Sequence, residues 1–335
     1  MTVKSVKRLP SRMQVAAALL SMAVAGIYSL SAAAGMNDLP ATAGGADDLA
    51  DIRPDRMVLL DVATHHGGVY AVGERGMVMA SADEGRHWQA HATPTTRTLT
   101  GIAFLDKDQA IAVGHGGALL RSQDGGDHWA QVEVSDLGGE SVLGVLALDE
   151  RTCLAWGAFG LLLRSEDGGK NWQRISVSGS DFDRHISQII RTSSTELLLV
   201  GESGTVARSP DLGLHWVTLA SPYAGSFFGA LRTDDGAWLV YGMRGNVFRS
   251  RDQGKSWSKI ELGTTLGIMS GQRLDGGRIL LVGNAGLTAL SPDNGATFTL
   301  GRSPRGLGIA RVAETGHGLL VAVGEGGAEN LDLTK

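Results

Sequence analysis

The stretch from Val113 to Trp129, VGHGGALLRSQDGGDHW, contains two short patterns that decide the fold, and both recur along the chain. The first pattern, V/W/Y-G-x-x-G, occurs seven times, and successive copies are 41 to 44 residues apart. That period is typical of the four-stranded blade of a β-propeller. The first glycines of the copies are Gly73, Gly114, Gly157, Gly201, Gly242, Gly283 and Gly324. We therefore expect an all-β fold, a seven-bladed β-propeller.

The second pattern, S-x-D-x-G-x-x-W/F, follows each of the first six copies and is known as the Asp-box. In such a turn the Ser and Asp side chains can bond the backbone, the Gly supplies a positive φ, and the aromatic ring packs under the turn onto the next blade. One copy in each blade is a constraint of the repeat, which argues against catalysis. We assign structural roles to Asp83, Asp124, Asp167, Asp211, Asp252, Asp293, Trp88, Trp129, Trp172, Trp216, Trp257 and Phe298.

Composition agrees with a turn-rich folded protein. Of the 335 residues 48 are Gly and only 8 are Pro, which fits many tight turns between short strands. The single Cys excludes an internal disulfide framework and a Cys-based zinc cluster.

The N-terminus has the order of a secretory signal peptide. Lys4, Lys7, Arg8 and Arg12 precede an apolar run from residue 15 to residue 30, and small residues follow. We expect a signal peptide over residues 1–34, cleaved near Ala34, and a periplasmic mature protein without stable membrane insertion. An uncleaved anchor is the alternative, because residues 15–34 are just long enough to span a bilayer.

Loss of these four cations changes the formal net charge from −5 to −9. An acidic mature protein is a poor partner for nucleic acid, since neutralisation of phosphate dominates that affinity.

The rest of the chain divides into a lead-in and the ring. Residues 35–56 are expected to contain the lead-in and, around Ala46 to Arg53, a strand that closes the ring, because the seventh unit ends without an Asp-box or a fourth strand. Residues 57–335 are expected to form the propeller. The predicted blades span residues 57–95, 96–136, 137–179, 180–222, 223–263, 264–303 and 304–335.

A binding site is expected on the face that carries the V-G-x-x-G turns. If the strands of a blade are lettered A to D from axis to rim, the B–C and D–A loops share one face and the Asp-box turns lie on the other. The side chains in these turns vary inside a constant frame, as the loops of a binding surface do. Solvated turn residues are the alternative reading. The candidates are Glu74, Arg75, His115, Phe159, Glu202, Ser203, Met243, Arg244, Asn284 and Glu325.

The D–A connection from Ala220 to Leu231, ASPYAGSFFGAL, concentrates aromatic residues on this face. Exposed aromatic side chains in a loop favour contact with a partner. One of Phe227 and Phe228 must pack between blades, because neighbours on a strand point to opposite faces. The best single patch is therefore Tyr223, Phe227, Met243 and Arg244, joined by Glu202.

The chain offers little that suggests catalysis, a metal or a cofactor, and we expect none of the three. The R-I-P motif of sialidases does not occur. Adjacent His65 and His66 would point apart on a strand, and the string DFDRHI from Asp181 to Ile186 reads as a polar loop. Cys153 lies in an apolar strand and reads as a buried small hydrophobe.

The two repeated patterns behind a signal peptide resemble the photosystem II stability and assembly factor family of seven-bladed propellers, over about residues 57–325. The phrases AVGERG from Ala71, PYAGSFFG from Pro222 and GNVFRSRDQGKSW from Gly245 look closest to its non-photosynthetic proteobacterial branch.

The resemblance implies an exported, non-catalytic scaffold, monomeric alone, that serves a membrane-protein complex. Genes of this branch often lie beside transporters of the resistance-nodulation-division (RND/MMPL) type, which makes such a transporter a candidate partner. An Arg-rich patch marks the photosynthetic branch; here Arg75 and Arg244 lie on the turn face, while the charge of −9 departs from that pattern.

Two functions of different classes follow. The first is a periplasmic binding or assembly module. The alternative, suggested by the Asp-box alone, is a carbohydrate-active, sialidase-like hydrolase or a glycan-binding lectin.

Overall fold

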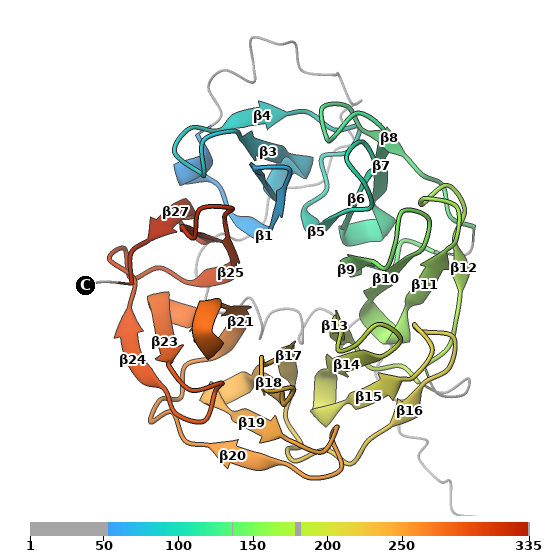
Figure 1. Ribbon diagram of the computed structural model, residues 1–335. Helices are drawn as coiled ribbons and strands as arrows, with labels where there is room; N and C mark the ends of the chain where they lie inside the picture. Colours follow the sequence, from blue (N-terminus) through green and yellow to red (C-terminus); the bar gives the residue numbers. More distant parts are fainter. Residues whose placement is uncertain (1–52, 136, 178–181, 334–335) are drawn as a thin grey trace, which may run out of the picture. The chain divides into compact units, whose positions relative to one another are not determined.

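The computed structural model describes residues 53–135, 137–177 and 182–333. Over these residues seven antiparallel sheets form a ring around a central opening, and the chain passes through them in sequence order (Figure 1). Six sheets have four strands, and the seventh has three described strands. The predicted all-β, seven-bladed propeller is therefore confirmed. No helix within these ranges is long and apolar enough to cross a bilayer.

In each blade the chain runs from the opening to the rim, because consecutive strands are hydrogen-bonded neighbours. The innermost strands are β1 (Leu59–His65), β5 (Leu99–Phe104), β9 (Val142–Ala147), β13 (Ile186–Arg191), β17 (Phe227–Arg232), β21 (Ile268–Arg273) and β25 (Ile309–Glu314). The second strands are β2 (Gly68–Gly73), β6 (Ala110–Gly114), β10 (Cys153–Gly157), β14 (Leu197–Gly201), β18 (Trp238–Gly242), β22 (Ile279–Gly283) and β26 (Leu320–Gly324).

The third strands are β3 (Val78–Ser81), β7 (Leu119–Ser122), β11 (Leu162–Ser165), β15 (Val206–Ser209), β19 (Val247–Ser250), β23 (Leu287–Ser291) and β27 (Gly327–Leu331). The outer strands are β4 (Gln89–His91), β8 (Ala130–Gln131), β12 (Gln173–Arg174), β16 (Val217–Thr218), β20 (Ser258–Ile260) and β24 (Thr299–Arg302). Short 3-10 turns are η1 (Pro54–Arg56), η2 (Glu74–Gly76), η3 (His115–Gly117), η4 (Ala158–Gly160), η5 (Glu202–Gly204), η6 (Met243–Gly245), η7 (Asp275–Gly277) and η8 (Asn284–Gly286).

The second strand of a blade is apolar on both faces, and β14 shows why. Every residue of this strand is buried. Leu197 and Leu199 pack into the cluster between the third and fourth blades, whereas Leu198 and Val200 pack into the cluster between the fourth and fifth. Successive side chains of a strand point to opposite faces. The continuous apolar run therefore reflects a strand enclosed by a neighbouring blade on each side.

The Asp-box turns have the predicted hydrogen bonds. In the second blade the Ser122 hydroxyl donates to Asp124 Oδ1 (2.8 Å) and accepts the Gly126 amide (2.9 Å). Asp124 Oδ1 also accepts the His128 amide (2.9 Å), and the Trp129 indole donates to the Gly126 carbonyl (2.9 Å). The Ser and Asp bonds recur in all six boxes. Each of these side chains thus satisfies backbone groups that the turn would otherwise leave unpaired.

A further residue of the box was not identified from the sequence. The side chain four positions after the Asp donates to the second carboxylate oxygen in every blade that has a box, at 2.6–2.7 Å. Because the carboxylate can only accept, a His at this position carries its proton on Nδ1. Any short donor satisfies the same oxygen, and the residues that do so are His87, His128, Asn171, His215, Ser256 and Thr297.

The predicted direction of aromatic packing was wrong. Trp172, in the third blade, packs into a cluster with Ile111 and Val113 of the second blade and with its own blade. Trp88, in the first blade, packs with Val321 and Val323 of the seventh. The aromatic ring therefore contacts the preceding blade, because the Asp-box turn folds back over the second strand of that blade. The spacing along the sequence could not distinguish the two neighbours.

Polar bonds between blades accompany these apolar contacts. The Arg121 side chain on β7 donates from Nε to the Gly168 carbonyl in the Asp-box of the next blade (2.7 Å). The same bond forms elsewhere between Arg164 and the Leu212 carbonyl (2.7 Å) and between Arg249 and the Asn294 carbonyl (3.1 Å). These arginines brace the outer half of three blade junctions, since each satisfies a turn carbonyl across the junction.

The junction between the seventh and first blades is also braced by side chains. Asn330 on β27 donates to the Glu84 carbonyl (3.2 Å). Asn330 pairs with Val321 as Arg121 pairs with Ile111, so it occupies the position that an arginine has in the second blade. Near the central opening, Arg311 Nε lies 3.0 Å from Asp61 Oδ1, and Asp61 Oδ2 accepts the Ile102 amide (3.0 Å). Burial raises the pKa of Asp61, and the Arg311 cation opposes that rise.

Several expectations fall on residues outside the described ranges. The signal peptide over residues 1–34, the lead-in and nearly all of the ring-closing segment, from residue 46 to residue 52, are among them. The described chain starts at Arg53, and η1 lies beside β27, the last described strand of the seventh blade. Closure of the ring by an N-terminal strand stays a prediction.

We expect Arg121→Ala to lower the free energy of unfolding by about 1–3 kcal/mol, because Arg121 is buried and its loss removes the donors to the Gly168 carbonyl and to Gln109 Oε1. Arg208, at the same register on β15, forms only a half-exposed ion pair with Glu196. Arg208→Ala should therefore cost at most about 1 kcal/mol. Urea denaturation of both variants measures these changes. Equal losses of unfolding free energy would contradict a stabilising role for the Arg121 hydrogen bonds across the junction.

The Asp-box carboxylates should titrate below their ordinary range. Hydrogen bonds from the Ser256 hydroxyl and then from its amide lower the pKa of Asp252 from 3.8 to about 2. The Asp252 carboxyl group therefore binds a proton less tightly in the folded state than in the unfolded state. Its contribution to the free energy of unfolding is present above about pH 4 and is lost as the pH falls toward 2. Ser256→Ala should raise the pKa of Asp252 in an NMR titration of its carboxyl carbon. The control Ser258→Ala, on the exposed strand β20, should leave it unchanged.

Candidate functional site

The V-G-x-x-G turns and the adjoining D–A loops form one face, called the turn face below. In the fourth blade the Glu202 amide donates to the His185 carbonyl (2.9 Å), just before the inner strand β13. A Cβ on Gly201 would lie 2.2 Å from that carbonyl oxygen, and one on Gly204 would lie 2.2 Å from the Tyr223 carbonyl oxygen of the next loop. Gly204 also has a φ of +72°. Both glycines are therefore fixed by sterics, which leaves the two residues between them free to vary.

The second of these variable residues adopts the left-handed conformation in six turns. It is Gly116 in the second blade and a residue with a Cβ in five others, with φ between 52° and 60°. Four of these five residues are exposed. We call these five the display residues: Arg75, Phe159, Ser203, Arg244 and Ala285.

The candidates from the sequence differ in exposure. Those that are exposed are Arg75, Phe159, Ser203, Arg244 and Asn284. Those that are half-buried are Glu74, His115, Glu202, Tyr223, Met243 and Glu325.

Phe227 is fully buried, so its assignment to an exposed patch was wrong. Its ring lies between the fourth and fifth blades with Leu198 and Trp238, while Phe228 is half-buried beside Gly267. The sequence required one of the pair to pack between blades but could not say which. Tyr223 packs against the same cluster, stacked on Phe248 with ring centroids 6.1 Å apart.

Two acidic candidates hold the turn face together. Glu202 Oε2 accepts the His185 amide (3.1 Å), and Glu325 Oε2 accepts the Gly308 amide (3.0 Å). In both blades the carboxylate satisfies the last amide before the inner strand. Glu74 stands at the same turn position, but its side chain forms no hydrogen bond with the described residues. These carboxylates are committed to the backbone in the fourth and seventh blades, which weakens the case for direct contact with a partner.

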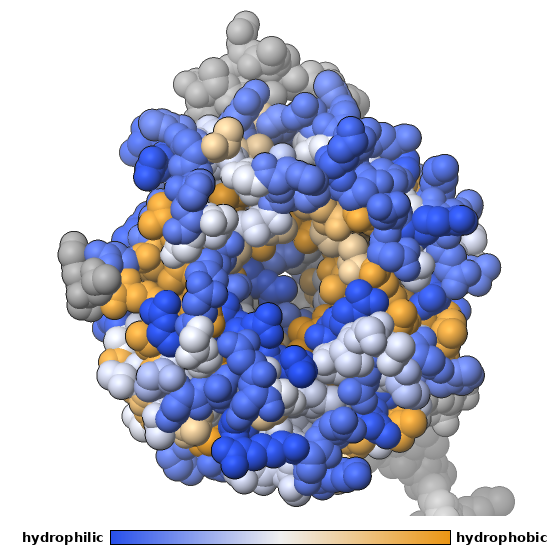
Figure 2. Space-filling model, viewed as in Figure 1, coloured by the Kyte–Doolittle hydropathy of each residue, from blue (hydrophilic) through white to orange (hydrophobic). Residues whose placement is uncertain are grey.

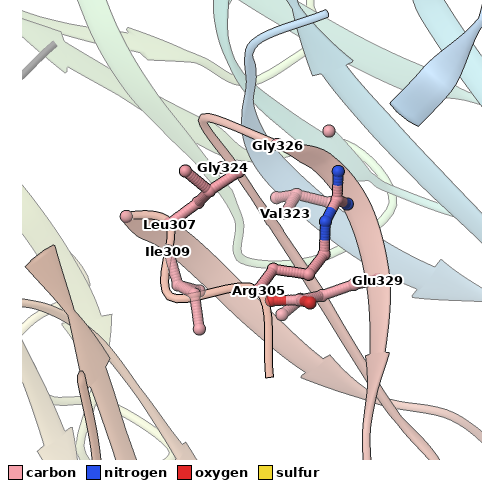
Figure 3. Close-up of a pocket in the computed structure, with 10 residues that line it drawn as sticks. Arg305, Leu307, Ile309, Val323, Gly324, Gly326 and Glu329 are labelled. Carbon is pink, nitrogen blue, oxygen red and sulfur yellow. The ribbon is translucent and has the colours of Figure 1, made fainter. Parts of the chain in front are cut away.

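The seventh copy of the pattern forms a different turn. Gly324 pairs with Gly327, so only Glu325 and Gly326 lie in the loop, and the register of β27 shifts by one residue. Figure 3 shows the pocket beside this hairpin, lined by Arg305, Leu307 and other residues. The cavity has about 10 Å³, which suffices for about one water molecule. This pocket is therefore too small for a ligand larger than a water molecule.

The sequence pattern placed His185 in a polar loop, and the structure shows that it packs against Phe159. The two rings meet edge to face with centroids 4.9 Å apart, and His185 Nδ1 accepts the Phe159 amide (3.1 Å). An accepting Nδ1 requires the neutral ring with its proton on Nε2. Phe159 remains 43% exposed and belongs to the few large apolar side chains exposed among the described residues. The neighbouring Asp181 lies outside the described residues.

The turn face also carries cations without internal partners. Arg75, Arg97, Arg244 and Arg305 are exposed and form no hydrogen bond or ion pair through their side chains with the described residues. The overall negative charge therefore does not prevent this face from binding an anionic group. Figure 2 shows that strongly hydrophilic and hydrophobic side chains both surround the central opening.

The other candidate sites have structural explanations. His65 and His66 do not lie on one strand as expected: His66 has a φ of 45° in a two-residue turn, and the rings meet at 4.4 Å. A cavity of about 140 Å³ adjoins them, but His65 is stacked on Phe104. Within the described ranges no three His, Cys, Asp or Glu side chains gather as a metal site would require. Burial raises the pKa of the Cys153 thiol to about 12, which makes it a poor nucleophile.

Glu202→Ala should lower the free energy of unfolding by about 1–3 kcal/mol, because it leaves the His185 amide without an acceptor. Glu74→Ala is the matched control and should change stability by less than about 0.5 kcal/mol, as surface substitutions do. Chemical denaturation measures both. A loss in the control as large as in Glu202→Ala would show that the turn needs an acid at this position for another reason.

Comparison with known proteins agrees with this geometry. Residues 86–260, just over half of the chain, match the family described as photosynthesis system II assembly factor YCF48. A search of curated proteins finds no match.

Among solved structures, YCF48 bound to a D1 peptide has a TM-score of 0.69 at 19% identity and covers 84% of this chain and 95% of its own. YCF48 from Cyanidioschyzon merolae has 0.67 at 17%, covering 83% and 95%. A GH74 xyloglucanase from Xanthomonas campestris has 0.66 at 15%, covering 82% of this chain and 52% of its own. At these identities the likeness shows the fold alone. The match over residues 86–260 is a match of the sequence to the family as a whole, and it covers more than half of the chain. The chain therefore belongs to the YCF48 family of photosystem II assembly factor-like propellers.

Proposed function

We propose that the protein is an exported, non-catalytic scaffold that binds an extramembrane segment of a membrane-protein complex on its turn face and assists assembly of that complex. The observation that carries the proposal is the contrast between the two faces. The Asp-box face uses its repeated polar side chains internally, whereas the turn face carries varied side chains, some of which, such as Arg75 and Arg244, are exposed and bond none of the described residues. Membership of the YCF48 family and the peptide bound to one YCF48 protein support protein binding as the activity.

The rigid ring suits such a role. Each blade is joined to its neighbours by an apolar cluster, and several junctions carry polar bonds as well. The display residues are therefore held at fixed separations before a partner arrives. A preorganised surface avoids part of the ordering cost of binding.

The finer features of the proposal come from the sequence. The n-, h- and c-region order over residues 1–34 supports export and a periplasmic location. The resemblance to the proteobacterial branch supports a transporter of the RND/MMPL type as the partner. The turn face adds a chemical preference, because its unpaired arginines favour a segment that carries carboxylates.

Absence of catalysis is also part of the proposal. The six Asp-box carboxylates each accept two or more hydrogen bonds within their own turn, which supports a structural role. The Glu202 and Glu325 carboxylates accept backbone amides. These groups are therefore not free to act as a pair in glycoside hydrolysis.

The test compares charge reversals on the two faces. The mature protein and two double variants are used to capture partners from detergent-solubilised cell envelopes, and the recovered complex is then purified and its binding measured directly. Arg75→Glu with Arg244→Glu should lose the complex. Arg86→Glu with Lys170→Glu, which makes the same change in charge on the Asp-box face, should retain it.

Equal loss or equal retention by the two double variants would contradict docking on the turn face. Repeated turnover of a soluble glycan such as xyloglucan by the wild-type protein would establish the hydrolase alternative in place of the scaffold.

A further inference from the structure

Residues with a Cβ occupy left-handed backbone conformations on both faces of the ring. On the turn face these are the display residues, and on the Asp-box face they are His66, Glu84, Leu212, Gln253 and Asn294. A left-handed conformation costs an L-residue about 1–2 kcal/mol, and glycine avoids this cost. Glycine does stand at the equivalent positions in other blades, as Gly116 and Gly125 show. A larger residue at such a position therefore needs a compensating contact.

On the Asp-box face the compensation is visible within the molecule. The Glu84 carboxylate accepts from the Thr315 hydroxyl (3.0 Å) and lies 2.6 Å from His317 Nδ1. Asn294 Oδ1 accepts the Asp234 amide (3.1 Å), and Leu212 packs into an apolar cluster. Three of the five strained side chains on this face thus bind another part of the ring, and the exceptions are Gln253 and the exposed His66, whose ring contacts that of its neighbour His65.

On the turn face three bulky display residues, Arg75, Phe159 and Arg244, lack such compensation within the described part of the chain, and the last two stand on either side of the fourth blade. Arg244 is exposed and its guanidinium forms no hydrogen bond or ion pair with the described residues. Phe159 touches His185 with one edge and is otherwise 43% exposed. Between them, in the fourth blade, stands the small and exposed Ser203. The strain at Phe159 and Arg244 is therefore not offset by internal contacts comparable to those of Glu84 or Asn294.

We propose that Phe159 and Arg244 are the specificity-determining residues of the turn face, and that they recognise a segment of the partner that presents an apolar side chain and a carboxylate. This inference rests on the proposed function. The segment would cross the third, fourth and fifth blades over Ser203, which is small enough to leave room between the two anchors.

The chemistry of the two side chains defines that segment. The guanidinium donors of Arg244 bond none of the described residues, and a carboxylate can accept two of them at once. The competing carboxylate in the preceding blade, that of Glu202, already accepts the His185 amide. Phe159 offers exposed ring surface, and aromatic side chains with arginines are the residues that dominate protein interfaces. Asp or Glu near Leu, Ile, Met or Phe is therefore the expected composition.

Glycine substitutions test the inference because they remove the side chain and relieve the strain together. Phe159→Gly and Arg244→Gly should each weaken binding at least tenfold, measured by biolayer interferometry against the complex that the wild-type protein captures in dodecyl maltoside. Ser203→Gly and Ala285→Gly relieve the same strain and remove little side chain, so their affinity should stay within twofold of wild type. All four should unfold within a few degrees of the wild-type midpoint.

The chemistry of the segment is tested on peptides that tile the extramembrane segments of the same captured complex. Wild-type protein should bind peptides that contain both acidic and large apolar residues. Exchange of the acidic residues of these peptides for Gln should abolish the difference in affinity between wild type and Arg244→Gly. Equal affinity of all four glycine variants, or binding confined to peptides without acids, would overturn the inference while leaving the proposed function intact. Failure of the wild-type protein to capture any membrane complex would instead overturn the proposed function.

Discussion

The hydrogen bonds of the Asp-box turn are the constraint on which the rest of the structure depends. In each box a hydroxyl and a carboxylate satisfy the amides of a turn that contains two successive left-handed residues, and this fixes where the following aromatic ring lies. The ring fills the space over the second strand of the preceding blade. Six repetitions of one local turn therefore determine the packing of neighbouring blades, and through it the circular arrangement.

This constraint divides the molecule into two faces with different freedom. Residues near the Asp-box turns are committed to bonds within a turn or across a junction, as Arg121 and Glu84 show. On the opposite face the V-G-x-x-G turns are held mainly by their two glycines and their first amide, as at Gly201, Gly204 and Glu202. Side chains such as Arg244 are therefore free to serve a partner. A scaffold protein needs this combination of a rigid ring and a variable surface.

The sequence predicted the fold because a pattern of a few neighbouring residues recurs seven times along the chain. The period of the glycines gave the number of blades, and the Asp-box gave the turns and their structural residues. The candidate site was predicted less completely. The turn face and the exposed Arg75 and Arg244 were found, but Phe227 was assigned to the surface although it is buried, and the role of His185 beside Phe159 was missed. Both errors concern contacts between residues in different loops.

The sequence alone determined what local geometry dictates: the number of blades, the turns at each glycine, and the choice of residues that can bond a turn. Tertiary structure decided which blade receives each aromatic ring, which of two adjacent phenylalanines faces the core, and which carboxylates are occupied by backbone amides. It also decided that the Arg244 side chain bonds none of the described residues, while Glu84 has several partners. The physical reason is that these outcomes depend on distances between loops about one repeat apart, and the ring sets those distances only when all of its blades are packed.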